Sequence, residues 1–346
     1  MLLSTSKTFT SADFTLSTGA VLPELTVAYE TFGTLAADKS NAILMCHGYT
    51  NHPHATGGGS DTWAVNLIGP GKGIDTDKYF VVCSNMLGSA YGTTGPASTN
   101  PATGKPYGPD FPKYTTADMV AAQHRLLDHL GIGRLRAVVG YSYGGHLTYL
   151  WGVTHPDRMD ALVPIAGVME RKTSAAQVAE IRDQFADCPG WNGGHYYGHE
   201  MEPGGVFEKL VAARKIRLTN YGIGKYLEDQ GMDQAARDVE LTRRAEIWAH
   251  EFDANSLYKL YEAGVGSDTT PLAGRIKAPL LQVLANTDSV VPVALGPEID
   301  ARLKAAGVTT EYVEIDTAYG HAGPMIDAAK WDAKLRAFLA EHAPVA

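Results

Sequence analysis

The sequence has little cysteine, and it has no long apolar run. Its three cysteines, Cys46, Cys83 and Cys188, are an odd number without a CxxC pair, which argues against a disulfide framework and a cysteine-ligated zinc site. We interpret them as buried, reduced thiols of a cytoplasmic protein. No stretch approaches about 18 apolar residues, and Lys7 and Asp13 interrupt the region that an export signal would need. We therefore expect neither a membrane span nor an export signal.

Positive charge is also scarce. The chain has 29 lysines and arginines against 38 aspartates and glutamates, which gives a formal net charge of −9, and no local basic patch offsets it. Such a surface repels phosphate backbones and anionic lipids, so neither nucleic acid nor a membrane is an expected partner. Charged residues make up only 19% of the 346 residues and hydrophobic residues 45%. This composition favours one extensive core that needs no disulfides or structural metals.

Short apolar, β-rich runs recur along the chain and alternate with helical patterns. Several runs lack polar alternation, which is typical of strands buried on both faces of a parallel sheet. The expected strands are 42–45, 79–83, 137–140, 162–165, 280–284 and 310–315, and the expected helices among and after them include 117–130, 143–154 and 328–342. The alternation predicts an α/β fold with a mostly parallel central sheet flanked by helices.

Two segments interrupt this alternation. Residues 86–116 are rich in Gly, Pro, Ser, Thr and Asn, and the segment is too long for an ordinary connection, so we expect an ordered functional loop. Residues 168–275 lack strand signals and contain helical stretches at 175–185, 206–218 and 235–249. We interpret this segment as a helical cap inserted into a core formed by residues 1–167 and 276–346.

The most informative motif is G-x-S-x-G, present as Gly140-Tyr141-Ser142-Tyr143-Gly144 between an expected strand and an expected helix. In a nucleophile elbow the serine occupies a strained strand-to-helix turn, and small residues two positions away allow close backbone approach. The alternative is a glycine-rich turn with a solvated serine. The strand before the motif and the helix after it favour Ser142 as a nucleophile.

A serine nucleophile needs a histidine base and an acid that orients the histidine. In enzymes with a nucleophile elbow, the three residues follow along the chain in the order Ser, Asp, His. Asp288 follows an apolar strand, and His321 follows the last strand. Carboxyl ends of strands are where open α/β sheets place their sites. Asp316 is a rival acid whose structural role would be strand-end capping. We favour Asp288, because residues 286–292 form a polar turn after a buried strand.

The oxyanion formed during acyl transfer requires backbone N–H donors. Tyr143, directly after the nucleophile, supplies one at the start of the following helix. The second should come from the loop after the first central strand, where His47-Gly48 is similar to the HG-type motifs of lipases and esterases. Tyr49 is the candidate donor there, although the loop could also be an ordinary strand-exit turn.

The other histidines do not predict a metal site. His195 and His199 are four residues apart, but Gly193, Gly194 and Gly198 argue against the helix that would bring their side chains together. His47, His52 and His54 lie near a glycine-rich loop without a convincing carboxylate partner. The GPGKG stretch at 69–73 lacks the Lys-Ser/Thr of a phosphate-binding loop. We therefore expect no metal and no cofactor.

Several longer motifs together resemble the homoserine O-acetyltransferase family of α/β-hydrolases. They are the segment 66–112, DMVAAQHRLLDHLGI at 118–132, the elbow, HPDRM at 155–159 and FDANS at 252–256. The resemblance implies an α/β-hydrolase fold, an acyl-serine intermediate, a helical cap over the active-site tunnel, and a homodimer formed through cap helices. It also gives Ser142, Asp288 and His321 the triad positions, and Tyr49 and Tyr143 the oxyanion-hole positions.

The sequence departs from this family at positions that decide the acceptor, the molecule that receives the acyl group. The family's transferases usually have an acid directly after the catalytic histidine, where this chain has Ala322. They also have an arginine after a Leu-Thr-Tyr-type stretch of the cap, and the matching residues 218–222 (LTNYG) contain none, although Arg217 is close. These departures predict an uncharged pocket around Tyr49, Tyr141, Tyr143 and Tyr149. A zwitterionic acceptor in such a pocket would lose its hydrating water and gain no charged partner in exchange.

The expected function is therefore a cytoplasmic serine esterase that hydrolyses short-chain, especially acetyl, esters, as in the esterase branch of the family. The alternative is a homoserine O-acetyltransferase, which shares every catalytic residue and would use acetyl-CoA as co-substrate. A binding protein with an α/β-hydrolase fold but no activity is a third interpretation. It predicts that a fluorophosphonate probe leaves Ser142 unlabelled.

Overall fold

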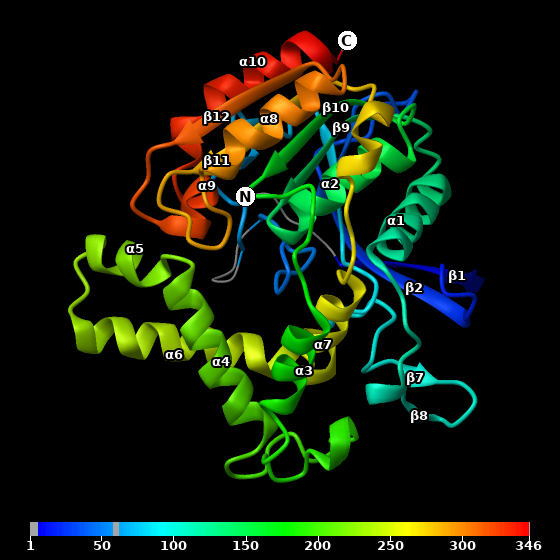
Figure 1. The fold of residues 1–346 in the computed structure, drawn as a ribbon, viewed down its shortest axis with the longest axis vertical. Helices are drawn as coiled ribbons and strands as arrows, with labels where there is room; N and C mark the ends of the chain where they lie inside the picture. The colour runs from blue at the N-terminus through cyan, green and yellow to red at the C-terminus, as the bar shows by residue number, and fades with distance from the viewer. Residues whose placement is uncertain (1–5, 58–61, 346) are drawn as a thin grey trace.

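The computed structural model describes residues 6–57 and 62–345 (Figure 1). Its main sheet has eight strands in the order β1-β2-β6-β3-β9-β10-β11-β12. Their bounds are β1 Lys7–Thr15, β2 Val21–Phe32, β6 Phe80–Ser84, β3 Ala42–Cys46, β9 Leu135–Tyr141, β10 Met159–Ile165, β11 Leu280–Ala285 and β12 Thr310–Ile315. The strands from β6 to β12 in this order are parallel, and β1 and β2 are antiparallel. The predicted mostly parallel α/β fold is confirmed, with an additional N-terminal hairpin formed by β1 and β2.

The central strands are buried on both faces, as their unbroken apolar runs predict. All residues of β3 and β6 are buried. The register pairs Cys46 of β3 with Gly140 of β9, and Ile165 of β10 with Tyr141 of β9. The carboxyl ends of β3, β9 and β10 therefore lie side by side, and the loops that follow these strands meet at one edge of the sheet.

Helices cover both faces of the sheet. The core on one face includes side chains of α1 (Thr116–Leu130), α2 (Tyr143–Thr154) and α8 (Leu295–Ala305), and the core on the other face includes side chains of α9 (Gly323–Ile326) and α10 (Asp332–His342). Helix α1 begins at a capping box of Thr115 and Asp118, and it ends at Gly131 in the left-handed conformation. These two signals explain the match with the expected helix at 117–130.

A layer of helices lies beyond the edge of the sheet where the loops after β3, β9 and β10 meet. It is seen in the lower part of Figure 1. It consists of α3 (Ala175–Asp183), α4 (Val206–Asn220), α5 (Ile223–Asp229), α6 (Gln234–Glu251) and α7 (Ala254–Ala263). An antiparallel bridge between Glu170 and Asp268 joins the two ends of this segment. We call these helices the cap helices. Helix α7 begins at Asp253 of the FDANS motif, whose carboxylate accepts the Ser256 N–H at 2.6 Å.

The remaining elements are short. Strands β4 (Ile68–Gly69) and β5 (Ile74–Asp75) pair on either side of the GPGKG stretch, and β7 (Thr99–Asn100) pairs with β8 (Lys105–Pro106) inside the long loop at 86–116. The 3₁₀ helices are η1 (Gly108–Asp110), η2 (Asn192–Gly194), η3 (Thr270–Arg275), η4 (Gly320–Ala322) and η5 (Ala328–Lys330). None of the described helices combines the length and the apolar character needed to cross a membrane. Residues 1–5 of the segment considered for export lie outside the described residues.

Candidate active site

Ser142 occupies the sharp turn between β9 and α2. Its backbone has φ 57° and ψ −113°, which is a strained conformation for a residue with a side chain. The turn is held by the Ser142 N–H, which donates to the Ile165 carbonyl at 2.8 Å. A Cβ on Gly140 would overlap the Gly144 carbonyl, and a Cβ on Gly144 would overlap the Cys46 carbonyl. Both glycines of the motif are therefore required by close backbone approach, as the elbow interpretation predicts.

Replacing Gly144 with alanine should destabilise the fold by about 1–3 kcal/mol, because the new methyl group must displace the loop after β3. The same shift would move the Tyr49 backbone and lower activity. Gly133→Ala is the matched control, since a Cβ at that position meets no atom within 4 Å. Urea unfolding of both variants measures the difference. Equal stability of the two variants would contradict the steric argument.

Ser142, His321 and Asp288 form a hydrogen-bonded row. The His321 Nδ1–H donates to Asp288 Oδ2 at 2.7 Å, which leaves Nε2 to accept the Ser142 Oγ–H at 2.7 Å. His321 and Asp288 are only 0% and 5% exposed. This geometry orients a buried imidazole base toward a partly buried serine hydroxyl.

Asp288 is oriented by the turn that follows β11. Its Oδ1 accepts the N–H groups of Val290 at 2.8 Å and Val291 at 3.0 Å, so its Oδ2 is left facing His321. The rival acid Asp316 instead accepts a hydrogen bond from the Asn286 side chain at 2.7 Å. The structure thus brings Asp288 to the histidine and gives Asp316 a role at the end of β12.

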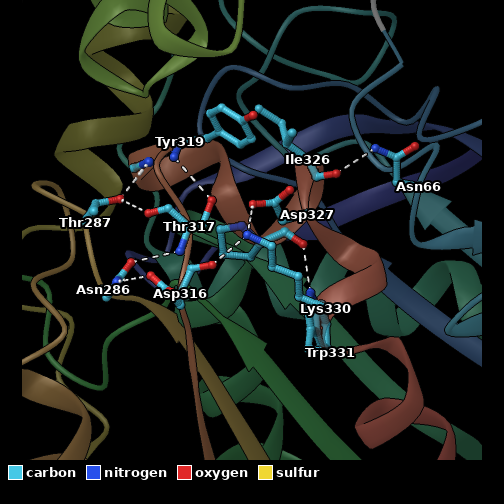
Figure 2. Close-up of polar contacts among 12 residues, drawn as sticks. Asn66, Asn286, Thr287, Asp316, Thr317, Tyr319, Ile326, Asp327, Lys330 and Trp331 are labelled. Carbon is cyan, nitrogen blue, oxygen red and sulfur yellow. Dashed lines mark hydrogen bonds and ion pairs between the residues drawn. The ribbon is translucent and has the colours of Figure 1, made fainter. Parts of the chain in front are cut away.

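The loops after β11 and β12 are tied to each other, as Figure 2 shows. The Thr287 hydroxyl donates to the Thr317 carbonyl at 2.7 Å and accepts the Gly320 N–H at 3.1 Å. The Thr317 N–H donates to Asn286 Oδ1 at 3.0 Å. Because one loop carries Asp288 and the other carries His321, these bonds fix the acid and the base relative to each other.

The imidazole of His321 lies between two tyrosines. Its ring centroid is 5.3 Å from that of Tyr141 and 4.9 Å from that of Tyr221 at the end of α4. The Tyr141 hydroxyl donates to the His321 carbonyl at 2.9 Å, and the Ala322 N–H donates to the Tyr221 carbonyl at 2.9 Å. The histidine loop is therefore bonded both to the sheet and to the cap helices.

Tyr49 and Tyr143, the residues of the two proposed oxyanion donors, line the same cavity as Ser142. Tyr143 is the first residue of α2, where N–H groups have no partner within the helix, and the Tyr49 N–H has no acceptor among the described residues. Their hydroxyls anchor both residues to α7, because Tyr49 donates to the Leu257 carbonyl at 2.5 Å and Tyr143 donates to the Leu260 carbonyl at 2.9 Å.

His47 positions the loop that carries Tyr49. Its Nδ1–H donates to the Gly48 carbonyl at 2.8 Å, and its Nε2 accepts the Met86 N–H at 3.2 Å. Burial lowers the pKa of His47 to about 4, so the ring is neutral and has one donor and one acceptor nitrogen. The histidine of the His-Gly pair therefore has a structural role next to the site.

Two cavities lie next to the triad. The serine cavity, of about 420 Å³, is lined by Ser142, Tyr49 and Tyr143, and also by the charged residues Arg171, Lys172, Arg302, Glu170 and Glu298. The arginine cavity, of about 360 Å³, is lined by Arg214, Tyr141, Ala322, Trp248 and Glu251 among others. Tyr221 lines both. The prediction of an uncharged pocket is wrong, because α4 and the segment before α3 bring arginines to these cavities.

The other residues considered from the sequence lie elsewhere. Tyr149 is fully buried and lines neither cavity. Arg217 lies over the Tyr49 ring, 5.3 Å from its centroid, and lines neither cavity, whereas Arg214 and Arg244 line the arginine cavity. His195 lies 3.6 Å from an Asp110 carboxylate oxygen, and His199 contacts Glu202 at 2.6 Å. Sequence reasoning missed Arg214, which lies one turn before Arg217 on α4.

A mostly parallel sheet covered on both faces, with a serine on a strained strand-to-helix turn, defines the α/β-hydrolase class of enzymes. Residues 41–326 match the family described as alpha/beta hydrolase fold. A homoserine O-acetyltransferase of Moorella thermoacetica is 38% identical over 358 residues, which cover 95% of this chain and 94% of that protein. The chain therefore belongs to the homoserine O-acetyltransferase family of α/β-hydrolases.

Solved structures give the same class. A homoserine O-acetyltransferase from Bacillus anthracis has a TM-score of 0.85 at 25% identity, with 100% of both chains covered. The structure of esterase E22 also has a TM-score of 0.85, at 27% identity, and covers 97% of this chain and 100% of that one. Both activities therefore occur on this backbone.

The prediction of a short-chain ester hydrolase is wrong. Curated relatives that are 35–38% identical over 89–97% of this chain are homoserine O-acetyltransferases. The prediction relied on missing charges at Ala322 and at residues 218–222. A charge can reach a pocket from another helix position, as Arg214 does, so those positions alone do not decide the acceptor.

Proposed function

We propose that this enzyme transfers an acetyl group from acetyl-CoA to the hydroxyl of homoserine. The observation that carries the proposal is the near-full-length similarity to homoserine O-acetyltransferases, at 38% identity for the Moorella thermoacetica protein. The site geometry supports it, because a serine, a histidine and an aspartate stand in a buried hydrogen-bonded row. The proposal needs no metal and no bound cofactor, since acetyl-CoA is consumed as a substrate.

The reaction has two half-reactions. Ser142 Oγ attacks the thioester carbonyl as His321 Nε2 takes its proton, and the tetrahedral oxyanion is stabilised by the N–H groups of Tyr49 and Tyr143. The C–S bond then breaks, and His321 gives the proton to the leaving thiolate. In the second half, His321 takes the proton of the homoserine hydroxyl, whose oxygen attacks the acetyl-serine. The bond between the acetyl carbonyl carbon and Ser142 Oγ then breaks, His321 returns its proton to Oγ, and O-acetylhomoserine is released.

Asp288 holds the histidine in the required tautomer through both halves. Its carboxylate accepts the Nδ1–H at 2.7 Å, so the lone pair of Nε2 faces the reacting oxygen. The charge of Asp288 stabilises the imidazolium that forms in each half-reaction. Transfer competes with hydrolysis of the acetyl-serine, and it is favoured when a bound acceptor is held against the carbonyl at a high effective concentration.

The dimer prediction stays a proposal. Ile216 of α4 and Val239 of α6 are 62% and 70% exposed, and these two helices pack against each other. These residues support a contact between cap helices of two copies.

Steady-state measurement of CoA release from acetyl-CoA tests the proposed function. We expect slow release without homoserine, and an acceleration of about 10² or more at saturating homoserine, with O-acetylhomoserine as the product. Serine and 1-propanol, supplied at the same concentration, are the control alcohols. Release that is fast without an acceptor and unaffected by homoserine would contradict the proposal.

A further inference from the structure

The chain enters the cap helices through residues 168–171 and returns to the sheet through residues 267–269. We call these two segments the first and the second cap linker. They are bonded to each other, since the Arg171 N–H donates to the Ser267 carbonyl at 2.9 Å. All four residues of the first cap linker also line the serine cavity. The position of the cap linkers is therefore part of what sets the shape of that cavity.

His146 of α2 is hydrogen-bonded to both cap linkers. Its Nδ1 lies 3.0 Å from the Val168 carbonyl oxygen, and its Nε2 lies 2.7 Å from Ser267 Oγ. Ser267 Oγ is in turn 2.6 Å from Thr116 Oγ1 at the start of α1. His146 is fully buried. One side chain of the helix that follows the nucleophile thus joins the two ends of the cap segment.

The chemistry of the partners fixes the direction of each bond. The Val168 carbonyl can only accept, so His146 Nδ1 carries the proton and donates it. Burial, together with the nearby charge of Arg171, lowers the pKa of His146 to about 4, so the ring is neutral and Nε2 accepts the Ser267 hydroxyl proton. Ser267 Oγ then accepts from the Thr116 hydroxyl. An apolar ring in place of the imidazole would remove a partner from both linkers.

Tyr143, three residues before His146, connects the same face of α2 to the cap. Its ring faces the Arg171 guanidinium, whose Cζ is 3.9 Å from the ring centroid, and its hydroxyl donates to the Leu260 carbonyl of α7. The His146 N–H donates to the Ser142 carbonyl at 3.2 Å, in the first turn of α2. A shift of the cap linkers would therefore act on the end of α2 that carries the nucleophile and one proposed oxyanion donor.

We propose that His146 is a positioning residue, which holds both cap linkers against α2 and so keeps the acetyl group on Ser142 aligned with its acceptor. His146 lines neither cavity, and it acts through Val168 and Ser267. The inference rests on the proposed function, because it concerns the acetyl-serine of that reaction. Loss of the two imidazole bonds should let the linkers move, which lowers the effective concentration of the acceptor and lets water compete for the acetyl group.

His146→Phe tests this role, because it keeps a ring of similar size and removes both bonds. We expect the ratio of acetyl-CoA hydrolysis to O-acetylhomoserine formation to rise about tenfold, and kcat for transfer to fall by about the same factor. Hydrogen exchange followed by mass spectrometry should be about tenfold faster in peptides that cover residues 168–171 and 267–269. Exchange in β9 should not change, which separates local loosening of the linkers from misfolding.

Two further variants test the bonds separately from the ring. Ser267→Ala is a smaller change that removes only the bond to the second cap linker, and it should raise the ratio about threefold. Adding Ser267→Ala to His146→Phe should have no further effect, since the bond is already lost. His146→Gln offers one donor and one acceptor, and it should recover most of the lost transfer. If His146→Phe fails to fold, Ser267→Ala and His146→Gln still carry the test.

His124→Phe is the matched control. It makes the same exchange of rings on α1, where His124 stacks on His155 at the other end of α2 with 4.4 Å between ring centroids. This variant should leave both the product ratio and the linker exchange unchanged.

Three results would overturn the inference. They are unchanged linker exchange in His146→Phe, faster exchange with an unchanged product ratio, and effects of His146→Phe and Ser267→Ala that simply add. A wild-type enzyme that forms no O-acetylhomoserine would instead overturn the proposed function. In that case linker exchange in the same variants still decides whether His146 holds the linkers.

Discussion

Replacing Ser142 with alanine should lower acetyl transfer from acetyl-CoA to homoserine by about 10⁶-fold, because the covalent route is lost together with the proton transfer to His321. The structure predicts little change in stability, since the Ser142 hydroxyl makes its bond to His321 and not to the core. The measurement is O-acetylhomoserine formation by mass spectrometry, with thermal unfolding to confirm an intact fold.

Ser89→Ala is a suitable control for that substitution. Ser89 is also buried, at 1% exposure, but its hydroxyl has no hydrogen-bond partner in the described part of the chain and it lies outside the serine cavity. This variant should retain near wild-type activity. Transfer by Ser142→Ala within about tenfold of the wild type would show that the acetyl group does not pass through this serine.

Replacing Asp288 with asparagine should lower transfer by about 10⁴-fold. The amide can donate a hydrogen bond to Nδ1, which favours the tautomer whose Nε2 carries the proton and cannot act as a base. Asp316→Asn is the matched control, because Asp316 accepts from Asn286 and does not touch the histidine. Its activity should fall by less than about threefold. A larger loss for Asp316→Asn than for Asp288→Asn, measured as kcat/KM, would reverse the assignment of the acid.

The fold could be predicted where the residues themselves restrict the backbone. Strands inside the sheet, such as β3 and β11, are buried runs close to their expected bounds, and α2 begins and ends where its pattern predicts. The elbow could be identified from Gly140, Ser142 and Gly144. Only small residues at the two glycine positions permit the close approach of the neighbouring backbone. The hairpin of β1 and β2 was not predicted, since most of β1 is exposed and the first half of β2 mixes exposed and buried positions.

The substrate could not be predicted from single motif positions. The absent acid at Ala322 indicated a neutral pocket, yet the charges that face the arginine cavity come from α4 and α6, far from the histidine in sequence. Arg214 and Glu251 line the same cavity because α4 packs against α6. The spacing of residues along the sequence does not indicate that two such residues line one cavity. Their placement becomes visible only when the packing of the helices is known.

In the proposed reaction, acetyl-Ser142 passes its acetyl group to homoserine in preference to water. The most direct test is to form the acetyl-enzyme with acetyl-CoA, remove free CoA and unreacted donor by rapid desalting, and add homoserine to one half of the sample. We expect O-acetylhomoserine in nearly stoichiometric amount with the acetyl-enzyme, whereas the half without homoserine should release acetate much more slowly. Acetate as the main product at the same rate in both halves would contradict it.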